Sequence, residues 1–154
     1  MTGTVDRTLE DMSITLPEVK PAGNYELFTR SGNTLFLSGH LPKTNEGELI
    51  KGKVGEDIDV GKAAEAAKVV AVNLIATIKA ACGDLDKVRI LKITGFVNSG
   101  ASFTSQPLVV NGASDLFVSV FGKEKGAHAR SAVGVGSLPF GVCVEIEAIV
   151  EVLP

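Results

Sequence analysis

Hydrophobic and polar positions alternate most regularly near the C-terminus of the chain. Within residues 142–152, the even-numbered positions from 144 onward are apolar, and the odd-numbered set includes three glutamates. The apolar set is Val144, Ile146, Ala148, Val150 and Val152. Alternation with a period of two is typical of a strand that buries one face. The pattern therefore predicts a strand over 142–152 that turns Glu145, Glu147 and Glu151 away from the helices.

Two longer stretches have a broad apolar face instead of an alternation. In residues 60–82 the polar positions follow roughly one stripe, and most of the rest is Ala, Val, Leu and Ile. This is typical of a helix laid flat on a sheet, and Gly83 is a suitable stop for it. A second helix is expected from about Pro107, which suits a first turn, to Phe121, with Gly122 behind it.

Shorter β-prone segments lie around these helices. Two arms around Ser31-Gly32-Asn33 predict a hairpin, because Gly and Asn tolerate the positive φ of a tight turn. Further strands are expected over 87–98 and 129–136. Residues 43–59 are polar and glycine-rich and predict a long loop.

The order of these elements, ββαβαββ, predicts an α+β fold with a mixed sheet and both helices packed on one face. With 154 residues, we expect a single domain spanning 1–154. Residues 1–20 form an N-terminal extension, in which residues 5–12 predict a short helix with Asp6 as its N-cap.

A five-stranded sheet with helices on one side leaves its other face uncovered. Here that face is expected to include Phe36, Phe96 and Ile149. Broad apolar surface is rarely left in water, and an identical subunit is the commonest cover. The pattern therefore favours a homo-oligomer.

The strand over 129–136 contains a permanent cation among small and β-branched residues. If Val133 and Val135 join the core, Arg130 points to the uncovered face and shares it with Glu145, while Ser131 points to the core. The other residues expected on the uncovered face are Ala132, Gly134, Gly136 and Glu147. An arginine suits a carboxylate because it offers two parallel donors.

Patterning alone leaves two interpretations of Arg130 and Glu145. They form a structural ion pair, or they form a ligand site in which Arg130 holds a carboxylate and Glu145 holds and activates a water. The histidines offer a further choice. A histidine side chain ordinarily titrates near neutrality, so His40 and His128 are each either a packing or hydrogen-bonding residue or a participant in acid–base chemistry.

Composition narrows the classes of partner. Apolar residues make up 45% and charged residues 21%, with 15 basic against 18 acidic side chains and a net charge of −3. Scattered basic residues give no electrostatic case for nucleic acid or an anionic membrane. Cys82 and Cys143 lie far apart without metal-ligand spacing, so we expect two buried, reduced thiols and no metal site. No signal or membrane-spanning pattern is present, and we expect a cytoplasmic protein.

Three segments together resemble the YjgF/RidA family, also called endoribonuclease L-PSP or reactive-intermediate imine deaminase proteins. They are SGHLP (38–42), HARSAVGVGSLP (128–139) and VEIEAIVEV (144–152), with the alanine-rich helix between the first two. The resemblance covers about residues 21–154. It implies a chorismate-mutase-like α+β fold, a homotrimer with three clefts between subunits, and hydrolysis of enamine or imine intermediates such as 2-aminoacrylate to 2-keto acids and ammonia.

The resemblance also implies roles for individual residues. Arg130 corresponds to the arginine that holds the substrate carboxylate, and Glu145 to the glutamate that positions the attacking water. No cofactor is implied, because a protonated imine carbon is already electrophilic. The other positions implied to line the cleft are Tyr25, Ser38, Gly39, Asn111 and Ala132.

Departures from the family pattern place the chain in a divergent branch. Ala132 stands where many members have a cysteine, a position thought to act mostly through its backbone amide, and His40 stands where many have glutamine. The N-terminal extension and a longer segment between Asn98 and Gly126 are further differences. The altered residues motivate an alternative, a non-catalytic module that binds small carboxylates or a partner at the same clefts. A ribonuclease is the third hypothesis, and the acidic balance argues against it.

Overall fold

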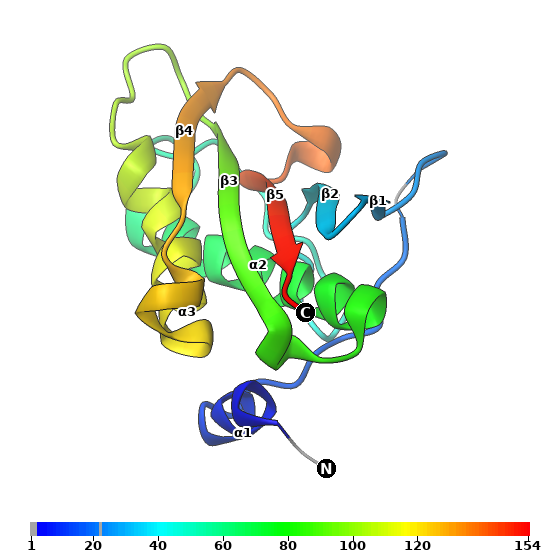
Figure 1. Ribbon diagram of the computed structural model, residues 1–154. Coiled ribbons are helices and arrows are strands. Elements are labelled where there is room, and N and C mark those ends of the chain that lie inside the picture. Colours follow the sequence, from blue (N-terminus) through cyan, green and yellow to red (C-terminus); the bar gives the residue numbers. More distant parts are fainter. Residues whose placement is uncertain (1–2, 22) are drawn as a thin grey trace.

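The computed structural model describes residues 3–21 and 23–154. Its strands and helices follow the predicted order, after a short N-terminal helix (Figure 1). The elements are α1 (Thr4–Asp11), β1 (Phe28–Ser31), β2 (Thr34–His40), α2 (Val60–Cys82), the 3-10 turn η1 (Leu85–Lys87), β3 (Val88–Asn98), α3 (Gln106–Gly126), β4 (Ala129–Val135), the 3-10 turn η2 (Pro139–Gly141) and β5 (Val144–Val152).

The strands form one mixed sheet in the order β1-β2-β5-β3-β4. The pair β3 and β4 is parallel, with α3 as the crossover, and the remaining neighbours are antiparallel. Figure 1 shows α2 and α3 together on one side of the sheet. The predicted α+β class, with both helices on one face, is confirmed.

The helices pack closely on each other and on β3, and small residues permit the approach. A Cβ added to Gly112 of α3 would lie 3.1 Å from the Cα of Ala64 in α2, and one added to Gly95 of β3 would lie 2.9 Å from Cγ1 of Val110. The core between the layers is apolar and fully buried at its centre, with Leu74, Ile93 and Phe117 all at 0% exposure.

The predicted ends of α2 are confirmed by its caps. The Asp59 side chain accepts a hydrogen bond from the Lys62 amide at the N-terminus, and Gly83 ends the helix with φ at 78°. The end of α3 differs from the prediction. Gly122 leaves the helical region, with φ at 82°, but a further helical turn follows and the element extends to Gly126.

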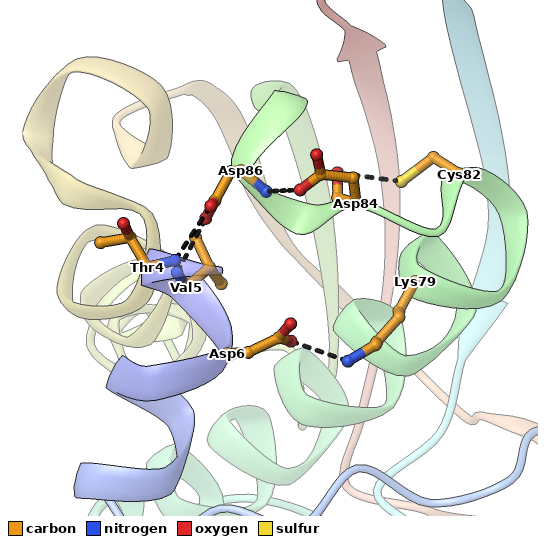
Figure 2. Close-up of polar contacts among 7 residues, drawn as sticks. All are labelled: Thr4, Val5, Asp6, Lys79, Cys82, Asp84 and Asp86. Atoms are coloured by element: carbon orange, nitrogen blue, oxygen red, sulfur yellow. Dashed lines mark hydrogen bonds and ion pairs between the residues drawn. The ribbon is translucent and has the colours of Figure 1, made fainter. Parts of the chain in front are cut away.

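The short N-terminal helix was expected to be capped by Asp6, and this prediction is wrong. Gly3 is the N-cap residue and makes no side-chain cap. Instead the Asp86 carboxylate, which follows α2 in the chain, accepts hydrogen bonds from the amides of Thr4 (2.9 Å) and Val5 (2.8 Å) (Figure 2). Asp6 forms an ion pair with Lys79 at 2.7 Å. A long-range acceptor therefore replaces the local cap.

The segment after α1 runs along α2 and lines a groove of about 840 Å³ together with residues 39–49. We call residues 12–21 the N-terminal arm. Asn45 fastens the opposite wall to the arm through a hydrogen bond from its Nδ2 to the carbonyl of Thr15, at 3.2 Å. Tyr25 and Gly39 line the same groove, so the arm lies beside two of the predicted site residues.

The orientation of β4 is opposite to the prediction. Arg130 pairs with Ile93, a core residue, so its side chain lies on the helix-covered face. Val133 pairs with Phe96 on the other face and is 42% exposed. Ser131, expected to point to the core, is exposed on that face as well. The reason is that α3 supplies polar acceptors for Arg130, so the helix-covered face accommodates the cation.

The face of the sheet without helices carries apolar side chains, as predicted. Phe36 is 45% exposed and pairs with Ile149, while Phe96 pairs with both Glu145 and Val133. We call this surface the open face. Within residues 3–21 and 23–154, no helix has both the length and the apolar character needed to cross a membrane.

Candidate functional site

Arg130 lies against the first half of α3 and is held there at two points. Its Nη1 donates to Ser114 Oγ at 3.1 Å, and its Nη2 donates to the Pro107 carbonyl at 3.4 Å. A guanidinium has five N–H donors, so these two bonds leave three for another acceptor. The side chain is half-buried at the outermost strand of the sheet. The group is therefore anchored but not saturated.

His128 shares the helix-covered side with Arg130 and contacts the same serine. Its Nε2 lies 2.9 Å from Ser114 Oγ, and its Nδ1 lies 2.6 Å from the Gly126 carbonyl. The ring also packs edge-on against Phe117, with centroids 5.8 Å apart. His128 and Arg130 therefore lie on the same side of the sheet, and Ser114 is the residue that joins them.

Glu145 lies on the open face, on the side of the sheet away from Arg130. Its carboxyl is half-buried, and burial, together with the charge of Glu147, raises its pKa above the usual value. Among the described residues, no donor forms a hydrogen bond or ion pair with it. A carboxyl in these surroundings is suited to accept a proton, or to pair with a cation brought by another molecule.

Gly39 is packed directly against Glu145. A Cβ built on Gly39 would lie 2.8 Å from the Cδ of that carboxyl, so a side chain at position 39 would displace the glutamate. The structure thus gives the glycine of the SGHLP segment a physical role: its missing side chain makes room for the carboxyl.

Ser38 and Tyr25 lie near this end of β2. The Ser38 hydroxyl donates to the Glu26 carbonyl at 2.6 Å, and its amide donates to the carbonyl of Leu27 at 2.9 Å. Ser38 therefore fastens the strand to the segment that carries Tyr25. Tyr25 is 45% exposed and lines the groove with Gly39.

His40 is buried between β2 and α2, on the side of the sheet away from Glu145. Its Nδ1 donates to the Ser38 carbonyl at 2.6 Å, and its Nε2 lies 2.7 Å from Thr77 Oγ1. Burial lowers its pKa, although the hydrogen bond to Ser38 acts in the opposite direction. These contacts favour the hydrogen-bonding interpretation of His40 over an acid–base one.

Asn111 and Ala132 lie with Arg130 on the helix-covered side. Asn111 is partly buried and lies between Pro107 and Ser114 on one stripe of α3, since residues four and three apart share a helix face. Ala132 pairs with Gly95 and packs against the core. The structure thus groups Arg130, Asn111, Ala132 and His128 on one side of the sheet, and Glu145 with Gly39 on the other.

Ser114 is the site residue that the sequence did not single out. It contacts both Arg130 and His128, yet it is one of several small or polar residues within 111–115. The available signal was its spacing of seven residues from Pro107, which places both on one face of α3. Nothing in the local pattern links that face to a strand that begins 15 residues later.

The two cysteines are free thiols. Cys143 is buried, and burial raises its pKa to about 11. Cys82 is only partly buried, contrary to the expectation of two buried thiols, and burial again raises its pKa. Neither thiol has the lowered pKa of a reactive cysteine.

A family model described as "YjgF/chorismate mutase-like, putative endoribonuclease" matches residues 6–149. Protein TCP17 of Trypanosoma cruzi is 47% identical over 151 residues, covering 97% of this chain and 94% of that protein. A 2-iminobutanoate/2-iminopropanoate deaminase of Dermatophagoides farinae is 29% identical over 136 residues, covering 86% and 89% of the two chains.

Solved structures of other proteins share this fold over nearly the whole chain. Atu1372 of Agrobacterium tumefaciens, a protein of unknown function, has a TM-score of 0.88 at 48% identity and covers 96% of this chain and 92% of its own. A Shewanella oneidensis structure has a TM-score of 0.92 at 31% identity, with coverage of 97% and 100%. These two matches extend well beyond the segments that carry the resemblance.

Proposed function

Since the chain belongs to the YjgF/chorismate mutase-like family, we propose that it hydrolyses small imines or enamines that carry a carboxylate, releasing a 2-keto acid and ammonia. In this proposal Arg130 holds the substrate carboxylate, and Glu145 orients the attacking water. The name of the mite relative, a 2-iminobutanoate/2-iminopropanoate deaminase, supports the substrate class.

The observation that carries the proposal is the state of Arg130. Two anchors on α3 fix the guanidinium, and three N–H donors remain uncommitted by them. A carboxylate needs two such donors for a bidentate pair.

The chemistry needs little beyond this placement. An enamine first tautomerises to the imine, and water then adds to the protonated C=N carbon. Glu145 accepts a proton from the water, which forms a carbinolamine, and returns that proton to the nitrogen. The C–N bond then breaks as the hydroxyl loses its proton to solvent, which leaves the 2-keto acid and ammonia. Holding the carboxylate beside an oriented water supplies mainly proximity.

We further propose that two copies of the chain build each site, within a homotrimer. Within one copy Arg130 and Glu145 lie on opposite sides of the sheet, so they do not face one substrate. The apolar open face, with Phe36 and Val133 over 40% exposed, is suited to be covered by another copy. An arginine brought close in this way would also offset the effect of burial on the Glu145 pKa and keep the carboxylate ionised as a base.

The activity is tested by generating 2-aminoacrylate with a dehydratase and measuring keto acid release above the spontaneous rate. We expect the wild-type chain to accelerate release, and Arg130→Ala to lose about 10- to 100-fold in kcat/KM, the range for charge-assisted hydrogen bonds. Arg89→Ala is the matched control, because Arg89 is an exposed arginine on β3. No acceleration by the wild type, or full activity in Arg130→Ala, overturns the proposal.

A second candidate is a carboxylate-binding module without catalysis. It is favoured by one observation: the hydroxyl of Ser38 is already committed to the Glu26 carbonyl, which leaves few polar groups for chemistry at the Glu145 end. Calorimetry with 2-oxobutanoate separates the two candidates, because binding without acceleration supports this module, and absence of binding rejects it.

An endoribonuclease, named in the family description, would need a basic surface for the RNA backbone. The chain instead carries 15 basic against 18 acidic residues. This function would be supported by RNA cleavage that depends on Arg130 and that persists after stringent purification of the protein.

A further inference from the structure

We infer that Ser114 and His128 are positioning residues for Arg130, and that a hydrogen-bonded relay through them sets the direction in which the guanidinium presents its free donors. This inference rests on the proposed role of Arg130 in carboxylate binding and names residues to which that proposal gives no role. We call the chain from the Gly126 carbonyl through His128 and Ser114 to Arg130 the relay.

The relay has one consistent assignment of protons. The Gly126 carbonyl only accepts, so His128 Nδ1 carries the hydrogen that spans the 2.6 Å to it. In the neutral ring Nε2 is then an acceptor and takes the hydroxyl proton of Ser114, 2.9 Å away. The Ser114 oxygen is left as an acceptor toward Arg130 Nη1 at 3.1 Å. A protonated ring would instead direct two cationic donors at one hydroxyl oxygen.

The far end of the relay is fixed by close backbone packing. A Cβ added to Gly126 would lie 2.8 Å from the Val118 Cα, so the carbonyl at position 126 lies tightly against the body of α3. Phe117, at 0% exposure, packs edge-on against the His128 ring and limits its rotation. The orientation of the His128 ring, and through it of the Ser114 hydroxyl that accepts from Arg130, is thus fixed by the backbone at Gly126 and by the contact with Phe117.

His128 matters because a serine hydroxyl in a helix has a competing partner. Such hydroxyls commonly bond back to the carbonyl of the preceding turn, and a hydroxyl proton turned toward Arg130 would oppose its N–H groups. Since His128 holds that proton, the Ser114 oxygen remains available to the guanidinium. The second anchor, the Pro107 carbonyl, lies seven residues before Ser114 on α3. Loss of Ser114 therefore leaves Arg130 attached only by the longer hydrogen bond, from Nη2 to that carbonyl.

The relay predicts a specific pattern of losses in keto acid binding and in imine hydrolysis. Ser114→Ala is expected to weaken 2-oxobutanoate binding and to raise KM about tenfold with kcat within about twofold, because a charge-assisted hydrogen bond that orients the binding group is lost. Ser114→Thr retains the hydroxyl and is expected to restore binding. Ser119→Ala, an exposed serine on the same helix, is the matched control.

His128→Phe keeps an aromatic ring against Phe117 and removes both nitrogens. It is expected to weaken binding by less than Ser114→Ala, and the double variant is expected to be no weaker than Ser114→Ala alone, because His128 acts only through Ser114. Nitrogen NMR of the wild-type chain is expected to show the neutral His128 ring protonated on Nδ1 and unprotonated on Nε2. Circular dichroism and a melting curve establish that each variant is folded.

The outcomes separate this inference from the proposed function. If Ser114→Ala and Ser114→Thr bind alike, if the losses in the double variant add, or if Nε2 carries the proton, the relay is rejected while the role of Arg130 stands. If Arg130→Ala itself binds 2-oxobutanoate like the wild type, the proposed function fails and the relay has no binding role to serve.

Discussion

Arg130 and Glu145 lie on opposite faces of the sheet, although only β3 separates their strands. Arg130 pairs with Ile93 of β3 on the helix-covered face, and Glu145 pairs with Phe96 of the same strand on the open face. A single copy therefore presents the two groups in opposite directions. If both act on one substrate, the arginine and the glutamate must come from different copies.

This relationship predicts complementation between two impaired variants. Arg130→Ala and Glu145→Gln are each expected to have strongly reduced activity as pure assemblies. When they are refolded together in equal amounts, about one quarter of the sites in a cyclic assembly combine an intact arginine with an intact glutamate from the neighbouring copy. Keto acid release is expected to recover to about that fraction of the wild-type rate.

As a control, the two folded variants are mixed without a refolding step. This tests whether recovery of activity requires exchange of subunits between the assemblies. A refolded mixture with no recovered activity would mean that each site uses both residues of one copy, and wild-type activity in either pure variant would mean that the replaced residue is not required. Size-exclusion chromatography with light scattering reports the assembly directly, and a stable monomer at assay concentration would contradict the two-copy site.

The sequence predicted the strands and helices well because their hydrophobic periodicity is local. The alternation in β5 and the broad apolar face of α2 each appear within a single segment, and the caps at Asp59 and Gly83 lie next to the helix that they end. The resemblance to the family rested on equally local segments, and the family model that matches residues 6–149 confirms it.

What the sequence could not predict depends on partners distant in the chain. Val133 was assigned to the core because it is apolar, but in the structure it is 42% exposed on the open face. Arg130, which alternates with Val133, was therefore assigned to the open face, but Ser114 and the Pro107 carbonyl accept its hydrogen bonds on the helix side. Hydrophobicity alone selects the wrong face wherever a distant helix supplies acceptors or a surface is suited to association.

Asp86 is expected to control the docking of the N-terminal helix. Replacing it with Ala removes the acceptor for the amides of Thr4 and Val5 and should cost about 0.5–2 kcal/mol of unfolding free energy, as for loss of a helix cap. The same change should speed proteolysis within the N-terminal arm. Lys79→Ala, which removes the partly exposed ion pair with Asp6, should cost only about 0–1 kcal/mol.

The capping hydrogen bonds also predict a pH dependence. They lower the Asp86 pKa below its usual 3.8, so the stabilisation is present above that value and is lost as the pH falls through the lower, folded-state pKa. The wild type and Asp86→Asn should therefore differ in melting temperature at neutral pH and converge in strong acid. A difference that persists in acid strong enough to protonate the folded-state carboxyl would contradict the capping role of Asp86.

Gly112 is expected to be required at the crossing of α2 and α3. An added methyl group would meet the backbone of Ala64, with its Cβ 3.1 Å from the Cα, and backbone cannot move aside as a side chain can. Gly112→Ala should therefore lower the unfolding free energy by about 1–3 kcal/mol in urea denaturation, despite the better helix propensity of alanine. Gly61→Ala near the start of α2, where an added Cβ would lie 3.3 Å from a carboxylate oxygen of Asp59, should be neutral or stabilising by up to about 1 kcal/mol.

His40 is expected to stabilise the fold in its neutral form and to resist protonation. Burial lowers its pKa from 6.5, so the unfolded chain takes up a proton at a higher pH than the folded chain does. The stabilisation is thus complete above about pH 6.5 and declines as the pH falls toward the folded-state pKa. Proton NMR should place the titration midpoint of His40 below 6.5, and His40→Gln should make the melting temperature less dependent on pH between about 5 and 7.

Thr77→Val removes the hydroxyl 2.7 Å from Nε2 of His40 and should lower the unfolding free energy by about 1–3 kcal/mol, because a buried nitrogen is left unpaired. A midpoint above 6.5, or a Thr77→Val variant as stable as the wild type, would show that His40 is accessible to solvent and available for acid–base chemistry.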